Sequence, residues 1–116
     1  MAIHRKKTKE YTQKRAAKRC AMVASVEAID ISTQTRLSAR MSELGIGGCY
    51  IDALNPFPVG TVIELRISRD QGTFEAKAKV VYCDSPMGMG VAFTEIAPEQ
   101  RLMLEDWLAE IVKPAP

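Results

Sequence analysis

Two arginines near the start of the chain have side chains suited to gripping a phosphorylated ligand. The segment "RAAKR" places Arg15 and Arg19 four residues apart, with Lys14 directly before it. Guanidinium groups donate paired hydrogen bonds to phosphates or to guanine O6 and N7, so two such forks can hold one nucleotide. A basic run of this kind can also be a solvated surface arm, so its role depends on the residues that it meets.

A glycine-rich segment, "ARMSELGIGGCYI" at residues 39–51, is the second candidate. Its Gly45, Gly47 and Gly48 are followed by a strand pattern rather than a helix, which excludes a dinucleotide-binding loop, and no P-loop lysine follows them. The glycines therefore either bend the chain between two strands or leave room for a ligand against the backbone. Arg40 and Ser42 share one face of the strand before them.

The sequence lacks the residue combinations that catalysis or metal binding needs. His4 is the single histidine, and Cys20, Cys49 and Cys83 lie far apart, so neither a zinc set nor a nucleophile and base pair is indicated. No pair of carboxylates suited to acid–base catalysis is apparent. We therefore expect a protein that is not an enzyme and that holds no metal ion or cofactor.

Positive charge is concentrated at one end of the 116-residue chain. Residues 1–20 hold eight Lys or Arg against Glu10, a net charge of +7, whereas the remaining residues hold eight against thirteen acids, a net charge of −5. We expect residues 1–14 to be a flexible basic arm and residues 15–116 to be one domain. Nucleic acid is disfavoured as a partner, because only Tyr11 interleaves with the charges of the arm. No apolar run reaches the roughly 18 to 20 residues of a membrane span, so we expect a cytoplasmic protein.

Alternation of apolar and polar residues predicts about six short strands after the arm. The segments are "CAMVASVEAIDI", "RLSARMS", "GCYIDAL", "TVIELRIS", "TFEAKAKVVYCD" and "VAFTEI". Residues 98–112 then predict a helix, with Pro98 in its first turn. Its apolar residues near helical spacing are Leu102, Met103, Trp107, Leu108, Ile111 and Val112. We expect a fold dominated by β-strands, a six-stranded antiparallel β-barrel with this C-terminal helix packed on it and Trp107 in the core.

In their order and spacing, these features resemble the PilZ domain, a family of bacterial receptors for the second messenger cyclic di-GMP. The family signature is Arg-x-x-x-Arg, followed further along by Asp or Asn-x-Ser-x-x-Gly. This chain supplies Arg15-Ala-Ala-Lys-Arg19 and Ser42-Glu-Leu-Gly45. The likeness covers nearly the whole chain, because the family also has a six-stranded barrel, a late strand like "MGMGVAF" and a closing helix like "APEQRLMLEDWL".

The resemblance implies a role for each motif residue. Arg15 and Arg19 would contact guanine and phosphate groups from the arm, and Ser42 would hydrogen-bond the ligand from the barrel surface. Gly45 would let a base approach the backbone, which agrees with its missing Cβ. Lys14 would add attraction for phosphate.

Arg40 occupies the position where the family has Asp or Asn. Aspartate and asparagine accept hydrogen bonds from guanine N1 and N2, whereas arginine can only donate. Arg40 therefore either stacks on a base or meets a phosphate, or its charge weakens binding. Asp30-Ile-Ser32 offers another Asp-x-Ser, but no glycine follows in register, so we interpret Asp30 as a turn cap. Asp52 is the other nearby acid, and alternation along its strand leaves open whether it faces the site.

Two functions follow from these residues. The first is a non-catalytic cyclic di-GMP receptor, in which the ligand draws the arm onto the barrel and the ordered arm presents a new surface to a protein partner. The alternative is a degenerate PilZ-like adaptor that binds no nucleotide and acts through protein contacts. This alternative is suggested by Arg40, which stands where the family has Asp or Asn.

Overall fold

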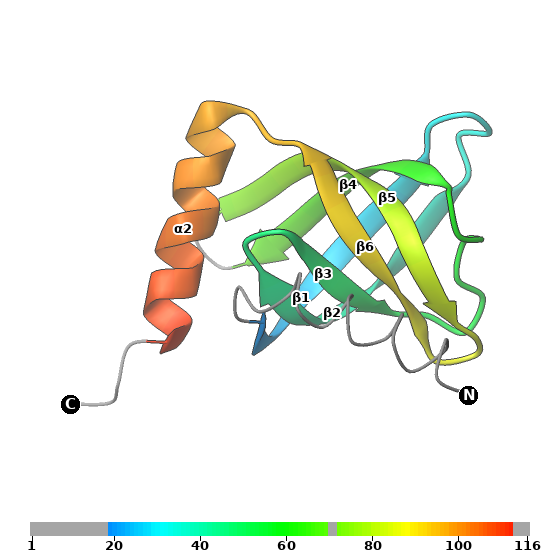
Figure 1. Cartoon of the computed structure of the whole chain (residues 1–116), viewed down its shortest axis with the longest axis horizontal. Helices are drawn as coiled ribbons and strands as arrows, with labels where there is room; N and C mark the ends of the chain where they lie inside the picture. Colours follow the sequence, from blue (N-terminus) through cyan, green and yellow to red (C-terminus); the bar gives the residue numbers. More distant parts are fainter. Residues whose placement is uncertain (1–18, 70–71, 113–116) are drawn as a thin grey trace, which may run out of the picture.

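The computed structural model describes residues 19–69 and 72–112 of the chain. Lys14, Arg15 and the predicted arm therefore lie outside the described residues, as does the domain boundary predicted at residue 15. The described chain forms six strands followed by one helix (Figure 1). Their bounds are β1 Arg19–Asp30, β2 Arg36–Gly45, β3 Gly48–Asp52, β4 Val62–Arg69, β5 Gly72–Asp84, β6 Gly88–Glu95 and α2 Pro98–Val112.

The six strands close into one barrel in the order β1-β2-β3-β6-β5-β4, and neighbouring strands are antiparallel. Closure pairs each strand on both sides, which protects the backbone groups that an open edge would expose. The predicted six-stranded antiparallel barrel with a C-terminal helix is thus confirmed. Two strands are longer than predicted: β2 continues past Ser42 to Gly45, and β6 begins at Gly88, before the predicted segment "VAFTEI". In both places pairing with a neighbouring strand outweighs the low strand propensity of glycine.

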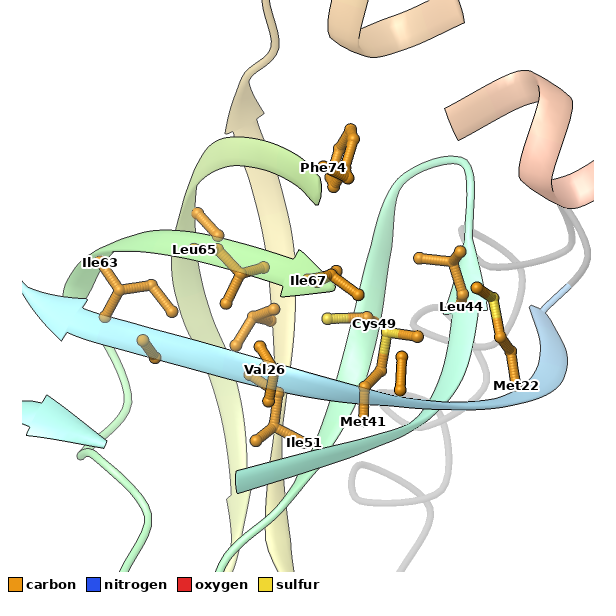
Figure 2. Close-up of a cluster of buried hydrophobic side chains, with 14 of the residues drawn as sticks. Met22, Val26, Met41, Leu44, Cys49, Ile51, Ile63, Leu65, Ile67 and Phe74 are labelled. Atoms are coloured by element: carbon orange, nitrogen blue, oxygen red, sulfur yellow. The ribbon is translucent and has the colours of Figure 1, made fainter. Parts of the chain in front are cut away.

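Inward-facing side chains of all six strands form one apolar core (Figure 2). The alternation is clear along β4, where Ile63, Leu65 and Ile67 are buried and Glu64 and Arg66 are exposed. No polar or charged side chain is buried in the described part of the chain. The polar side chains of these residues are therefore left on the outer surface of the barrel.

Helix α2 packs across one end of the barrel (Figure 1). Leu104 is fully buried and Trp107 nearly so, and the ring of Trp107 lies 6.2 Å from that of Phe74. The guanidinium carbon of Arg69 lies 5.3 Å from the Trp107 ring centroid, a cation–π contact. Trp107 is thus a core residue, as predicted. Leu102, which the sequence placed on the apolar face, is 63% exposed, because the buried face is centred on Leu104 and Trp107 instead.

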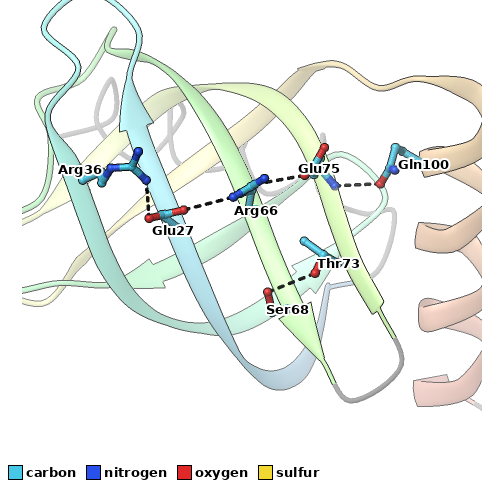
Figure 3. Close-up of polar contacts among 7 residues, drawn as sticks. All are labelled: Glu27, Arg36, Arg66, Ser68, Thr73, Glu75 and Gln100. Carbon is cyan, nitrogen blue, oxygen red and sulfur yellow. Dashed lines mark hydrogen bonds and ion pairs between the residues drawn. The ribbon is translucent and has the colours of Figure 1, made fainter.

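A chain of ion pairs crosses the outer face formed by β2, β1, β4 and β5 (Figure 3). Glu27 accepts a hydrogen bond from Arg36 at 2.7 Å and lies 3.7 Å from Arg66, which donates to Glu75 at 3.1 Å. The side-chain oxygen of Gln100 in α2 accepts a bond from the backbone N–H of Glu75 at 2.8 Å, which ties the helix to β5. This face also has an open hollow of about 580 Å³, whose described lining contains none of the predicted site residues.

Candidate ligand-binding site

The β1–β2 pairing brings the end of the arginine motif to the glycine segment. Arg19, the first residue of β1, is the cross-strand partner of Gly45, the last residue of β2. Paired residues of antiparallel strands have Cα atoms about 4.5–5.5 Å apart, so the two motifs meet at one end of the barrel. Only the backbone of Arg19 is described, and Lys14 and Arg15 lie outside the described residues.

The hairpin between β2 and β3 depends on close packing at Gly48. A Cβ atom on Gly48 would collide with the backbone carbonyl oxygen of Val91 in β6, whereas no atom lies within 4 Å of a Cβ built on Gly47. The carbonyl oxygen of Gly47 accepts a hydrogen bond from the backbone N–H of Phe93 at 2.8 Å. One interpretation of the glycines, that they turn the chain between two strands, is thus confirmed.

Arg40, Ser42 and Asp52 form a polar cluster on the outer face of β2 and β3, here called the Asp52 cluster. Arg40 is the cross-strand partner of Asp52. Its Nε donates to Asp52 Oδ2 at 3.2 Å, and a terminal nitrogen of its guanidinium lies 3.1 Å from the same oxygen. Ser42 Oγ donates to Asp52 Oδ1 at 3.0 Å. One carboxylate therefore holds two of the predicted site residues.

Sequence reasoning left open whether Asp52 faces the site, and the structure places its side chain in this cluster. The β2–β3 register shifts between Met41 and Glu43, a bulge that strand alternation does not reveal. The side chain of Asp52 is 32% exposed and that of Arg40 is 65% exposed. Ion pairs at such exposure contribute about 0 to 1 kcal/mol to stability. The cluster therefore contributes little to holding the fold together.

The predicted site residues of the barrel, Arg40, Ser42 and Gly45, lie at different positions along β2 and do not form one cluster. Arg40 and Gly45 belong to the same strand, which rises about 3.3 Å per residue, so their Cα atoms lie roughly 16 Å apart. Ser42 lies between them. The structure thus brings Arg40 and Ser42 together through Asp52, and brings Gly45 to the backbone of Arg19. A ligand that touches both ends must lie along the strand.

Asp30 lies outside this site and caps the turn between β1 and β2. Its Oδ1 accepts hydrogen bonds from the backbone N–H of Ser32 at 2.9 Å and from the Ser32 hydroxyl at 3.0 Å. This is the arrangement in which an aspartate replaces a backbone acceptor in a turn. The interpretation of Asp30 as a turn cap is confirmed.

Residues 19–69 and 72–112 contain neither a group of metal ligands nor a membrane-spanning helix. No group of three or more His, Cys, Asp or Glu side chains in that part of the chain could hold a metal ion. No helix there is long and apolar enough to cross a membrane. Cys20 is half-buried, Cys49 is buried and Cys83 is exposed.

Solved structures that are similar to this chain include two described as PilZ domains. The PilZ domain of YcgR from Escherichia coli with c-di-GMP has a TM-score of 0.68 at 12% identity, over 81% of this chain and 88% of that chain. The PilZ domain of CeSA from a cellulose-synthesizing bacterium has a TM-score of 0.63 at 14% identity, over 81% and 94%. The inhibitor of motility MotI/DgrA of Bacillus subtilis has a TM-score of 0.67 at 18% identity, over 79% and 48%. At these identities the likeness shows the fold alone.

Family membership comes from the sequence comparison. A comparison with curated proteins gave no match. The family model described as the PilZ domain matches residues 13–110, which includes every described strand and nearly all of α2. Because the match spans most of the sequence, this chain belongs to the PilZ domain family.

Proposed function

We propose that this protein is a cytoplasmic receptor for cyclic di-GMP. The observation that carries the proposal is the β1–β2 register, which sets the backbone of Arg19 opposite Gly45 and so joins the two halves of the PilZ signature. Similar structures include the YcgR PilZ domain of Escherichia coli and PlzA of Borreliella burgdorferi, both with c-di-GMP. Together these observations support the receptor over other functions for a small barrel of this family.

In this proposal the arm supplies positive charge and the barrel supplies the surface. Arg15 and Arg19 bind phosphate and guanine groups, Lys14 adds attraction for phosphate, and Gly45 leaves room for a base. Residues 21–116 carry a net charge of −5, so the barrel alone repels an anionic ligand and the arm is needed to offset this repulsion. Binding is coupled to docking of residues 1–14, whose ordering cost reduces the measured affinity.

The Asp52 cluster gives the ligand both kinds of hydrogen-bonding partner. Arg40 donates hydrogen bonds to phosphate. Ser42 is hydrogen-bonded to the same Asp52 carboxylate as Arg40, so its hydroxyl lies beside the guanidinium. Asp52 accepts hydrogen bonds from guanine N1 and N2, the function that Arg40 cannot perform in its own position. A carboxylate on the neighbouring strand thereby takes the place of the acid missing from the motif.

A second candidate is an adaptor that binds no nucleotide and acts on its protein partner directly. The observation that favours it is the Arg40–Asp52 ion pair, which already neutralises the unusual arginine without a ligand. In the receptor the partner recognises the docked arm, whereas in the adaptor it recognises the barrel as it stands. The two functions therefore differ in whether cyclic di-GMP changes the protein.

Titration calorimetry of the full chain with cyclic di-GMP separates the two candidates. We expect saturable heat for the wild type and a loss of affinity of about 10- to 100-fold in Arg15→Ala and Arg19→Ala, since hydrogen bonds to charged groups are lost. Arg66→Ala is the matched control, because Arg66 is an exposed arginine paired with Glu75 away from the site. Absence of heat and of amide resonance shifts at high micromolar ligand contradicts the receptor. In that case binding restored by Arg40→Asn supports the adaptor.

A further inference from the structure

Two tyrosines lie on the outer face beside the Asp52 cluster. Tyr50 of β3 pairs with Gly90 of β6, and Gly90 pairs in turn with Tyr82 of β5, so these three residues form one row, here called the tyrosine row. Cys49 and Ile51, which flank Tyr50 in β3, are fully buried, so Tyr50 points outward. The two rings have centroids 6.1 Å apart and planes inclined by 33°. They form a paired aromatic surface in which Tyr50 lies one strand away from Ser42 and Arg40, and Tyr82 lies two strands further, beyond β6.

Two glycines in β6, which lack side chains, allow both tyrosine rings to pack against the backbone of the sheet. A Cβ atom on Gly90 would collide with the ring of Tyr82. A Cβ atom on Gly88 would lie 2.7 Å from the hydroxyl oxygen of Tyr50 and 2.8 Å from one of its ring carbons. Each ring therefore rests against the backbone of β6, and each tyrosine is half-buried, with part of its surface accessible.

Carboxylates border the tyrosine row on one side. Asp52 of β3 and Asp84 of β5 both pair with Gly88, which forms a second row next to the first. Burial, and then the charges of Asp84, Tyr82 and Asp52, raise the pKa of Tyr50 above its ordinary value of 10.0. The aromatic surface is thus flanked by groups that accept hydrogen bonds.

We propose that the tyrosine row is the stacking surface for a guanine base, whose N1 and N2 donors are directed at Asp52 and Asp84. Every base can stack on an aromatic side chain, and a carboxylate beside the stack favours a base with donors on its edge. The inference rests on the proposed function and extends the site from β2 and β3 onto β5 and β6. Neither half of the PilZ signature reaches Tyr82 or Asp84 on β5.

Paired substitutions test the stacking. Tyr50→Leu and Tyr82→Leu keep an apolar side chain and remove the aromatic face, whereas Tyr50→Phe and Tyr82→Phe keep the ring. We expect calorimetry to show cyclic di-GMP binding about 5- to 100-fold weaker in the leucine variants and changed by less than about twofold in the phenylalanine variants. Wild-type affinity in both leucine variants overturns the proposal. So does equal weakening in the phenylalanine and leucine variants, because the hydroxyl rather than the ring would then be required.

Ring resonances of the wild-type protein give a measure that does not depend on the variants. A stacked base shifts the ring proton signals of Tyr50 and Tyr82 upfield, so GMP is expected to shift them and ribose 5-phosphate, which lacks the base, is not. If cyclic di-GMP does not bind, the receptor proposal fails, and the GMP titration still decides the role of the tyrosine row. If neither cyclic di-GMP nor GMP shifts the ring signals, the proposed stacking role of the tyrosine row is overturned. Cyclic di-AMP, whose adenine N1 accepts rather than donates, is expected to bind at least about tenfold more weakly, and equal affinity overturns the carboxylate contacts.

Discussion

The Arg40–Asp52 pair lies at the surface, where an ion pair stabilises a fold only weakly. Both side chains are partly exposed, and surface ion pairs rarely contribute more than about 1 kcal/mol. In a double-mutant cycle of Arg40→Ala and Asp52→Ala, urea unfolding is expected to give a coupling energy of at most about 0.5 kcal/mol. The Arg66–Glu75 pair, also exposed and with an N–O distance of 3.1 Å, is the matched control and is expected to give a similarly small coupling energy.

The same cycle measured by cyclic di-GMP affinity is expected to give a larger coupling, of about 1 kcal/mol or more, because bound ligand removes water from the cluster. The control pair is expected to give none. A coupling in binding no larger than the coupling in unfolding contradicts the role assigned to the Asp52 cluster.

Tyr50 is a reporter of the charges beside the tyrosine row. Its pKa lies above 10.0 because of burial first and the charge of Asp84 second, with smaller effects from Tyr82 and Asp52. Asp84→Asn removes the charge that has the largest effect on this pKa, so we expect the pKa of Tyr50 to fall back toward 10.0. NMR titration of the tyrosine ring signals from about pH 8 to pH 12 measures it. Glu75→Gln, on the face of the ion-pair chain, is expected to leave that pKa unchanged.

The raised pKa has a consequence for stability. The folded protein keeps the proton of Tyr50 after the unfolded chain has lost it, so the free energy of unfolding falls as the pH rises from the ordinary pKa through the raised one. Asp84→Asn is expected to make this fall shallower in urea unfolding. An unchanged fall, together with an unchanged pKa, contradicts the placement of Asp84 beside Tyr50.

The β2–β3 hairpin offers a matched pair of glycine substitutions. A Cβ atom at Gly48 meets the carbonyl oxygen of Val91, a backbone atom that cannot move aside without disturbing the β3–β6 pairing. Gly48→Ala is therefore expected to lower the free energy of unfolding by about 2 to 3 kcal/mol. Gly47→Ala, where the space is open, is expected to change it by less than about 0.5 kcal/mol. Urea unfolding measures both, and equal effects contradict the close contact.

The sequence predicted the strands and the helix well, because apolar residues recur in most of them at the spacing typical of a strand or a helix. Ile63, Leu65 and Ile67 alternate with polar residues, so β4 could be predicted from its letters alone. The site could be predicted only in part, because cross-strand neighbours depend on the register. The bulges between Met41 and Glu43 in the β2–β3 pairing and between Val80 and Tyr82 in the β5–β6 pairing change which residues meet. The observed register settles the orientation of Asp52, which alternation left open, and brings the two tyrosines into one row.

The molecule separates its fold-holding contacts from its candidate site. The core fills the barrel and α2 packs across one end (Figures 1 and 2). The Asp52 cluster and the tyrosine row lie on the outer surface. Such a division allows the outer surface to change without loss of the core. It also predicts that ligand binding and core packing act independently on stability.

Leu104→Ala tests this independence, because Leu104 is a fully buried side chain of α2. The substitution is expected to lower the free energy of unfolding by about 2 to 5 kcal/mol, and Leu102→Ala, at an exposed position of the same helix, by less than about 0.5 kcal/mol. Cyclic di-GMP at about 100 times its Kd is expected to add about 2.7 kcal/mol to the wild type and to both variants alike. Urea unfolding with and without ligand measures the increments. A smaller increment in Leu104→Ala than in Leu102→Ala means that the helix and the ligand site are energetically coupled, since the ligand then binds the repacked barrel less tightly.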